Sequence, residues 1–285
     1  MTDALIGYTG FVGSNLMAAH EFGAKFNSKN ISDIEGQSFG LLVCAGAPAK
    51  KWYANLHPDE DKETLDGLMA HLSKVSAERV VLISTVDVFK TTYLADENTP
   101  VDMEGLNAYG LNRRRLELFV KEHFENVLIV RLPGLVGRGL KKNILFDFHN
   151  NNEVLKIESR GVFQFYPVQR LWDDIRKAEE NGLTLVHLTS APVSVEEVAR
   201  EVWGREFRNE VLPKPAKYDF RSAHAGLWGR ERYQVSRAEE IAAIKEWAAT
   251  EPRRIQGKSC RSQYRTSPGK RMRSLRLRSS CRDLT

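Results

Sequence analysis

The feature that most constrains this chain comes at its beginning, where a short apolar stretch runs directly into three spaced glycines. Residues 4–13 read Ala-Leu-Ile-Gly-Tyr-Thr-Gly-Phe-Val-Gly, which places Gly7, Gly10 and Gly13 between an expected strand and an expected helix. Glycine allows a sharp bend and a close approach of backbone to a phosphate, and a helix N-terminus offers free N–H groups and partial positive charge. We expect Gly7 to form the turn, Gly10 to face a pyrophosphate and Gly13 to pack the helix against the strand.

Apolar segments rich in β-forming residues alternate with helical patterns along the chain, which indicates parallel strands joined by crossover helices. The expected strands are residues 4–7, 24–27, 40–45, 79–84, 127–132 and 184–188. The expected helices are residues 11–20, 59–73, 106–124, 193–203 and 238–249. The pattern predicts the α/β fold class, with a Rossmann-type doubly wound parallel sheet and a small C-terminal substrate domain.

The predicted domain boundaries follow changes in this pattern. Residues 1–190 form a dinucleotide-binding core with a substrate-loop insertion around 135–165, and residues 191–250 form a small substrate-binding domain. Residues 251–285 form a basic tail that we expect to be disordered. From Arg253 onward there are 11 Lys and Arg residues and one acidic residue, whereas the rest of the chain has 31 basic and 36 acidic residues. The tail is either an arm for nucleic acid or acidic surfaces or a non-native extension, and we favour the extension.

Composition argues against several classes of protein. No stretch approaches the roughly 18 consecutive apolar residues of a membrane span, and the first strand begins too early for a signal peptide. The three cysteines, Cys44, Cys260 and Cys281, are too few and too scattered for a disulfide framework or a zinc site. The seven histidines show no metal-ligand spacing. We therefore expect a cytoplasmic protein with no metal and no membrane partner.

Two later segments carry side chains suited to proton transfer. A buried-type strand ends in Ser84 and Thr85, and a helix carries Tyr109 and Arg113 four positions apart, which places them on one face. A nearby cation favours phenolate and lowers the pKa of a tyrosine from about 10. A hydroxyl from Thr85, or else Ser84, can hold the same substrate oxygen while hydride moves to or from the adjacent carbon. Taken alone, the tyrosine and arginine also fit a surface stack beside a basic helix face.

In this order, the segments resemble the extended short-chain dehydrogenase/reductase family, whose members have a GxxGxxG turn, a Ser or Thr at the end of a middle strand, and a YxxxK motif. The resemblance covers about residues 1–250, with the three glycines matching the turn, Thr85 the catalytic hydroxyl and Tyr109 the catalytic tyrosine. Within this family, residues 84–89 look most similar to those of nucleotide-sugar enzymes such as dTDP-4-dehydrorhamnose reductase and the sugar epimerases and dehydratases. The resemblance implies an NAD(P)-dependent oxidoreductase or epimerase that acts on a nucleotide-linked sugar.

Two positions depart from the family pattern. Arg113 stands where the family has the lysine that lowers the pKa of the tyrosine and binds the nicotinamide ribose, and the planar guanidinium forms different hydrogen bonds. Val86 stands where sugar 4,6-dehydratases have an acidic residue, and Asp87 alone leaves that acid–base pair incomplete. The resemblance thus favours an epimerase or keto-reductase over a 4,6-dehydratase. The alternative is a catalytically silent NAD(P)-binding sensor or scaffold protein.

The resemblance also assigns the remaining contacts and implies a homodimer formed through the Tyr109 helix and the helix before it. Residues 26–30 contain no acid to bind a ribose 2′-hydroxyl, which favours NADP over NAD. The expected cofactor-binding residues are Gly7, Thr9, Gly10, Phe11, Val12, Gly13, Asn27, Ser28, Lys29, Asp33, Ala45, Gly46, Ala47, Tyr109 and Arg113. The expected substrate-binding residues, which equally suit a solvated surface, are Asp87, Arg138, Lys142, Asn143 and Arg221.

Overall fold

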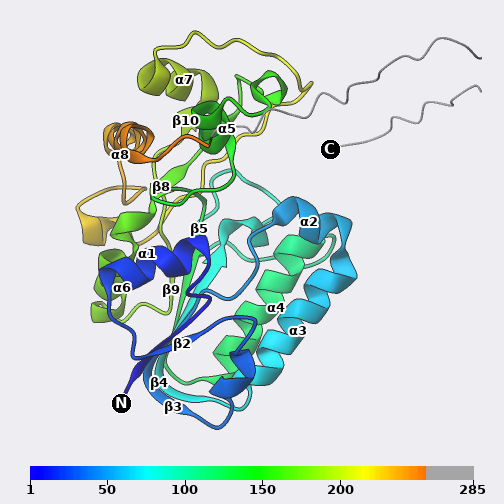
Figure 1. Ribbon diagram of the computed structural model, residues 1–285, viewed down its shortest axis with the longest axis vertical. Helices are drawn as coiled ribbons and strands as arrows, with labels where there is room; N and C mark the ends of the chain where they lie inside the picture. The colour runs from blue at the N-terminus through cyan, green and yellow to red at the C-terminus, as the bar shows by residue number, and fades with distance from the viewer. Residues whose placement is uncertain (255–285) are drawn as a thin grey trace, which may run out of the picture. The chain divides into compact units, whose positions relative to one another are not determined.

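The computed structural model describes residues 1–254, of which residues 1–253 form one compact unit. At its centre is a parallel sheet with helices on both faces (Figure 1). Most of the expected basic tail lies outside the described residues, together with Cys260 and Cys281.

The sheet has six strands in the order β2-β1-β3-β4-β5-β9, and every pairing in it is parallel. The strands are β1 (Asp3–Ile6), β2 (Ala24–Phe26), β3 (Ser38–Cys44), β4 (Ser76–Thr85), β5 (Val127–Leu132) and β9 (Leu185–His187). All six predicted strands are present within three residues of their expected ends. The strand order reverses at β1, which has β2 on one side and β3 on the other. The predicted Rossmann-type doubly wound sheet is therefore confirmed.

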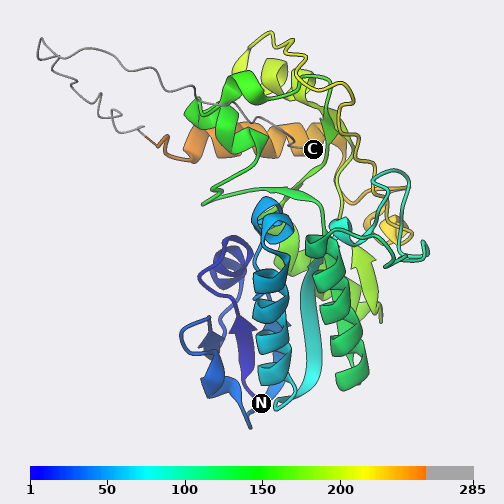
Figure 2. The same cartoon turned by 90° about the vertical axis from the view of Figure 1, so that its right-hand side faces the viewer.

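Helices cover both faces of this sheet, as two views at right angles show (Figures 1 and 2). The helices on the first face are α1 (Phe11–Ala19) and α6 (Leu171–Glu180). The helices on the second face are α3 (Pro58–Leu72) and α4 (Ala108–His123). A short helix, α2 (Lys51–Leu56), connects the end of β3 to α3. The crossovers place the carboxyl ends of the strands at one edge, where ligands bind in open α/β sheets.

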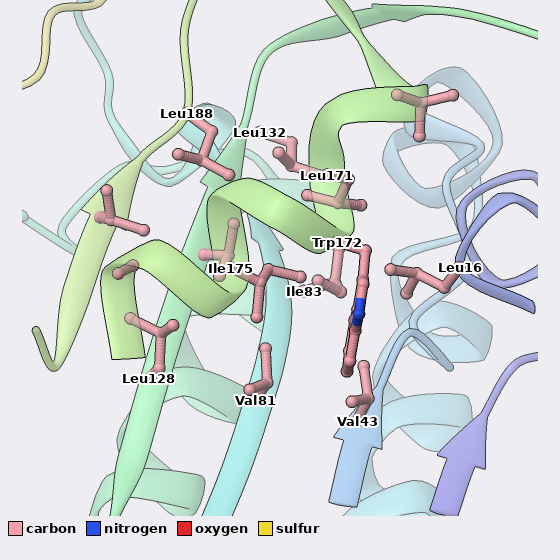
Figure 3. Close-up of a cluster of buried hydrophobic side chains, with 14 of the residues drawn as sticks. Leu16, Val43, Val81, Ile83, Leu128, Leu132, Leu171, Trp172, Ile175 and Leu188 are labelled. Atoms are coloured by element: carbon pink, nitrogen blue, oxygen red, sulfur yellow. The ribbon is translucent and has the colours of Figure 1, made fainter. Parts of the chain in front are cut away.

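Alternate side chains of each strand enter two different hydrophobic cores, because successive residues of a strand point to opposite faces. In β3, Val43 belongs to the core beneath α1 and α6, whereas Leu42 belongs to the core beneath α3 and α4. Figure 3 shows the first core, in which Trp172 and Ile175 of α6 lie over the strands. Burial on both faces fixes the strand register and thereby the positions of residues that follow each strand.

A smaller group of elements lies beyond the carboxyl edge of the sheet (Figures 1 and 2). Its helices are α5 (Ile144–Asn150), α7 (Val195–Trp203) and α8 (Arg237–Thr250). Its short strands pair β6 (Gly134–Val136) with β8 (Phe165–Pro167), and β7 (Val162–Phe163) with β10 (Val193–Ser194). The core of this group joins Val136, Leu145 and Phe165 to Val198 and Ile244. The insertion expected at 135–165 and the segment expected at 191–250 therefore pack together.

Three observations on residues 1–254 relate to the expectations drawn from composition. None of the helices in this range combines the length and apolar character needed to cross a bilayer. Within residues 1–254, no group of three or more His, Cys, Asp or Glu side chains is arranged to hold a metal ion. Cys44 is a free, buried thiol at the end of β3, where burial raises its pKa to about 11.

Candidate functional site

The first and third glycines of the N-terminal turn are required by the backbone around them. Gly7 has φ +84°, and a Cβ atom there would lie 2.3 Å from the carbonyl oxygen of Ala45. A Cβ atom on Gly13 would lie 2.1 Å from the carbonyl oxygen of Gly7. Real atoms cannot approach so closely, so Gly7 allows β1 to pass beside β3 and Gly13 allows α1 to pack on the turn. Both roles agree with the prediction from the sequence.

The N-terminus of α1 is open toward the carboxyl edge of the sheet. Gly10 is the N-cap, no side chain caps the first-turn amides, and the first turn contains no acidic residue. Thr9 and Gly10 are exposed, whereas Phe11 and Val12 are partly buried against the core. Uncapped amides at a helix N-terminus attract anions. These residues therefore fit the phosphates of a dinucleotide, the group that the glycine pattern predicts.

The second segment that we expect to bind a cofactor is a tight turn after β2. The side-chain oxygen of Asn27 accepts a hydrogen bond from the backbone N–H of Lys29 at 2.8 Å, and that of Asn30 accepts one from the backbone N–H of Asn27 at 2.8 Å. These bonds occupy both amide side chains in shaping the turn. The side chains of Ser28, Lys29 and Asp33 are exposed. The turn thus presents a hydroxyl and an ammonium group to solvent beside the glycine turn.

The third segment, Ala45–Gly46–Ala47, follows β3 and lies next to the glycine turn. The backbone N–H of Ala45 donates to the carbonyl oxygen of Ile6 at 2.9 Å, so the ends of β1 and β3 are held side by side. A Cβ atom on Gly46 would lie 2.9 Å from the Ile6 side chain. The point where the strand order reverses is therefore lined by small residues from two strands, as in sheets that bind dinucleotides.

Tyr109 and Thr85 come together although they are 24 positions apart in the sequence. The Thr85 hydroxyl lies close enough to the Tyr109 side chain to lower the pKa of the phenol, and Tyr109 is only 8% exposed. Asn107 caps α4 by accepting from the backbone N–H of Gly110 at 3.0 Å, which fixes the first turn that carries the phenol. A Cβ atom on Gly110 would lie 2.3 Å from the carbonyl oxygen of Asp87, so α4 begins in close contact with the end of β4.

Arg113 is four residues after Tyr109 on α4, as expected, but its guanidinium is bonded to other groups in the protein interior. Nη1 lies 2.5 Å from Oδ2 of Asp61 on α3 and 3.2 Å from the carbonyl oxygen of Tyr109. Nη2 donates to the carbonyl oxygen of Pro48 at 2.5 Å, and Nε is buried without a partner. The guanidinium carbon lies 3.9 Å from the centre of the Tyr109 ring. Arg113 therefore joins α4, α3 and the loop after β3, rather than pointing freely toward a ribose.

The pKa of Tyr109 differs in direction from the expectation. Burial is the largest influence and raises the pKa of Tyr109 above its ordinary value, outweighing the opposing effect of Arg113. Asp87 raises it further, while Thr85 and Lys51 lower it. Arg113 does lower the pKa of Tyr109, as expected, but by less than burial raises it. Tyr109 is therefore protonated near neutral pH.

Ser84, the other candidate hydroxyl, belongs to a buried ion-pair network. Its hydroxyl donates to Glu117 at 2.6 Å, and Arg131 makes two hydrogen bonds to the same carboxylate, at 2.7 and 2.9 Å. Burial opposes ionisation of Glu117, but Arg131, Ser84 and Arg114 outweigh it and hold its pKa below the ordinary value. Glu117 is two helical turns after Tyr109 on α4. The network thus fastens the tyrosine helix to β4 and β5, and Thr85 remains the hydroxyl beside Tyr109.

The expected substrate residues have different surroundings. Arg138 is exposed, Asn143 caps α5 through its side-chain oxygen, and Arg221 pairs with Asp219 at 3.2 Å. Lys142 donates to the carbonyl oxygen of Ala49. Burial lowers the pKa of Lys142, and the positive charges of Lys50 and Arg113 lower it further. Lys142 is therefore the expected substrate residue whose surroundings most favour an anion.

Asp87, the remaining expected substrate residue, is paired inside the site. Its carboxylate accepts from Nζ of Lys51 at 2.8 Å, and its backbone N–H donates to the Thr85 hydroxyl at 3.1 Å. The sequence analysis did not identify Lys51, nor did it identify Asp61 as the partner of Arg113. Both lie outside recognisable motifs, on α2 and α3, and only long-range packing brings them to the tyrosine.

Comparisons with known proteins show the fold. No protein-family model matches the sequence, and no curated protein matches it. Among solved structures, a dTDP-4-dehydrorhamnose reductase from Clostridium acetobutylicum is similar with 18% identity and a TM-score of 0.65, covering 87% of this chain and 99% of that chain. One from Bacillus anthracis, in complex with NADP, is similar with 17% identity and a TM-score of 0.63 at the same coverage. The NAD-dependent NDP-hexosamine 5,6-dehydratase TunA is similar with 19% identity, a TM-score of 0.65, and coverage of 87% and 97%.

These structural likenesses define the class of fold. The chain has the fold of the extended short-chain dehydrogenases/reductases, as its sequence motifs predicted. The names of these similar structures refer to dTDP- and NDP-linked sugars, and one of the structures holds NADP while another is described as NAD-dependent. At identities below 20%, this likeness concerns the fold, and the activity of this chain has to be argued from its own residues.

Proposed function

We propose that this protein is an NAD(P)H-dependent keto-reductase or epimerase of a nucleotide-linked sugar, with Tyr109 as its acid–base group. The observation that carries the proposal is the buried pair of Tyr109 and Thr85 at the carboxyl edge of a sheet whose first turn fits a dinucleotide. Thr85 holds the substrate oxygen and Tyr109 exchanges its proton. The similar structures support the substrate class, since they act on dTDP- and NDP-linked sugars.

The residues of the first three strand ends fit a nicotinamide dinucleotide. The uncapped N-terminus of α1 would hold the pyrophosphate, and the exposed Ser28 and Lys29 would hold a 2′-phosphate, which favours NADP. When bound, the nicotinamide supplies or accepts the hydride. The similar structures include an NADP complex and an NAD-dependent enzyme, so they support the dinucleotide and leave the choice between the two to experiment.

The protonation state of Tyr109 favours reduction. Because burial raises its pKa, the phenol keeps its proton near neutral pH and can give it to a carbonyl oxygen as hydride reaches the adjacent carbon. Oxidation of an alcohol needs the phenolate instead. We therefore favour the keto-reductase direction. Lys142, with its pKa lowered beside Lys50 and Arg113, would contact the diphosphate of the substrate, whose negative charge offsets these neighbouring cations.

Consumption of NADPH and NADH with a panel of 4-keto nucleotide sugars tests the proposal. Tyr109→Phe should lower kcat by about 10²–10⁴-fold while leaving cofactor affinity unchanged, since only the transferable proton is removed. Tyr53→Phe is the matched control, because the Tyr53 hydroxyl donates to the exposed Glu60 at 2.7 Å. Full activity of the Tyr109→Phe protein would contradict the assignment.

One other outcome of this experiment would favour the alternative function. Tight binding of NADPH without reduction of any keto sugar would favour the sensor or scaffold protein over the enzyme. A homodimer and a cytoplasmic location stay predictions, which size measurement of the purified protein and localisation of a tagged copy would test.

A further inference from the structure

A lysine on α2 lies beside the tyrosine–threonine pair. Nζ of Lys51 is 2.8 Å from Oδ1 of Asp87, and Tyr218 is a second group close enough to act on the pKa of Lys51. Asp87 in turn contacts Thr85 through its backbone N–H, at 3.1 Å from the hydroxyl oxygen. Asp87 therefore connects the Lys51 ammonium group, through its carboxylate, with the Thr85 hydroxyl beside Tyr109, through its backbone N–H.

Contacts of the first turn of α4 hold α2 and Asp87 beside Tyr109. Asn55 follows Lys51 by one helical turn on the same face of α2, and its side-chain oxygen accepts from the backbone N–H of Tyr109 at 3.1 Å. On the opposite side, Gly110 packs directly against the carbonyl oxygen of Asp87. The position of Lys51 relative to Tyr109 is thus set by the same contacts that begin α4.

The charged groups that act on Tyr109 come from three elements, and they differ in what else they bind. Arg113 of α4 is committed to Asp61 and to the carbonyl oxygens of Pro48 and Tyr109. Asp87, directly after β4, carries the opposite charge. Lys51 of α2 is the other cation among these groups, and it pairs with Asp87 while its side chain is 39% exposed.

We propose that Lys51 is a positioning residue that supports proton transfer by Tyr109, so that a cation from α2 acts on the tyrosine in addition to Arg113, which also holds the helices together. This inference rests on the proposed function, because it assigns Lys51 to the same site. Lys51 acts in two ways: it stabilises negative charge on the phenolic oxygen, and it neutralises Asp87, whose charge opposes that state. Electrostatics agree with the geometry, since Lys51 lowers and Asp87 raises the pKa of Tyr109.

The charge of Lys51 itself is secure. Burial acts to lower the pKa of Lys51, but Asp87 and Tyr218 outweigh it and the pKa lies above the ordinary lysine value. Conversely, burial and Asp87 raise the pKa of Tyr218 while Lys51 lowers it. Lys51 therefore remains protonated throughout the neutral range in which the proposed reduction would occur.

The test measures the pKa of Tyr109 directly, by NMR of protein labelled with ¹³Cζ-tyrosine. Tyr109→Phe identifies the resonance among the 8 tyrosines. Lys51→Met should raise the pKa of Tyr109, as expected for loss of a nearby cation. Lys51→Arg should keep it close to the wild-type value. Lys62→Met, which removes the same charge from an exposed pair on α3, should leave it unchanged.

A second comparison separates the direct effect of Lys51 from its effect on Asp87. Asp87→Asn should lower the pKa of Tyr109, and adding Lys51→Met to that variant should raise it again. This double variant leaves no unpaired carboxylate, so it also serves if Lys51→Met alone does not fold. An unchanged pKa of Tyr109 in Lys51→Met, or an equal shift in Lys62→Met, would overturn the proposal, as would no effect of Lys51→Met in the Asp87→Asn protein.

Turnover provides an independent measurement. In reduction of a keto sugar, Lys51→Met should lower kcat by tenfold or more, and Lys51→Arg should restore most of it. If the wild-type protein reduces none of the sugars, the proposed function fails, whereas the NMR titration still decides whether Lys51 acts on Tyr109. The two failures are therefore distinguishable.

Discussion

Replacing Arg113 and Asp61 separately and together tests whether this pair is a structural clamp. Both side chains are almost fully buried, with 3% and 4% of their surfaces exposed, and their atoms lie 2.5 Å apart. Removing one partner of such a pair leaves the other charge buried and uncompensated, which costs about 3–5 kcal/mol. We therefore expect Arg113→Met and Asp61→Asn each to lower the free energy of unfolding by about this amount.

The double variant should lose much less than the sum, because neither charge then remains unpaired. A coupling energy of about 2 kcal/mol or more is expected from urea unfolding followed by tryptophan fluorescence. The exposed pair of Lys62 and Asp66 on α3, at 2.7 Å, is the matched control and should show about 0.5 kcal/mol or less. If the losses for Arg113→Met and Asp61→Asn simply add, with a coupling energy no larger than that of the control pair, the clamp is refuted.

Three further outcomes follow from the geometry of the site. Gly13→Ala should destabilise the fold by about 2–3 kcal/mol and weaken dinucleotide binding, because its Cβ would overlap a backbone carbonyl 2.1 Å away. Gly67→Ala is the control, since a Cβ there would meet nothing within 4 Å, and it should stabilise the fold by about 0.5–1 kcal/mol in thermal unfolding. Lys29→Glu should weaken binding of NADPH but not of NADH in fluorescence titrations, with Lys25→Glu on β2 as control; equal losses for both cofactors would count against the 2′-phosphate contact. Burial raises the pKa of Tyr109, and reduction needs the protonated phenol. The value of kcat/KM for reduction should therefore stay level through neutral pH and fall only above about pH 10. A fall centred near neutral pH would contradict this assignment.

The sheet and the glycine turn could be predicted because their signals are local. Strands buried on both faces are continuous apolar runs, and Gly7 and Gly13 occupy positions that exclude any Cβ. Tyr109 and Thr85 could be predicted as partners because each lies where a strand or helix meets the carboxyl edge.

The surroundings of Arg113 could not be predicted from its spacing. Four residues on a helix give a shared face with Tyr109, but the decisive partner, Asp61, is 52 residues earlier on another helix. The short helix α2 was also missed, since its six residues include the largely exposed Trp52 and Leu56 and give no amphipathic pattern. Lys51 therefore had no signal in the sequence, and only the packing of Asn55 on α4 brings it to the site.

The most direct test of the account follows a deuterium atom from 4-deuterated NADPH to a 4-keto nucleotide sugar. We predict that the wild-type protein places deuterium on the former carbonyl carbon of the sugar, detected by NMR of the product. The Tyr109→Phe protein should bind the dinucleotide with the same affinity and transfer almost none. Absence of deuterium from every sugar tested, or equal transfer by the two proteins, would contradict the central claim that Tyr109 and Thr85 serve hydride transfer at this edge of the sheet.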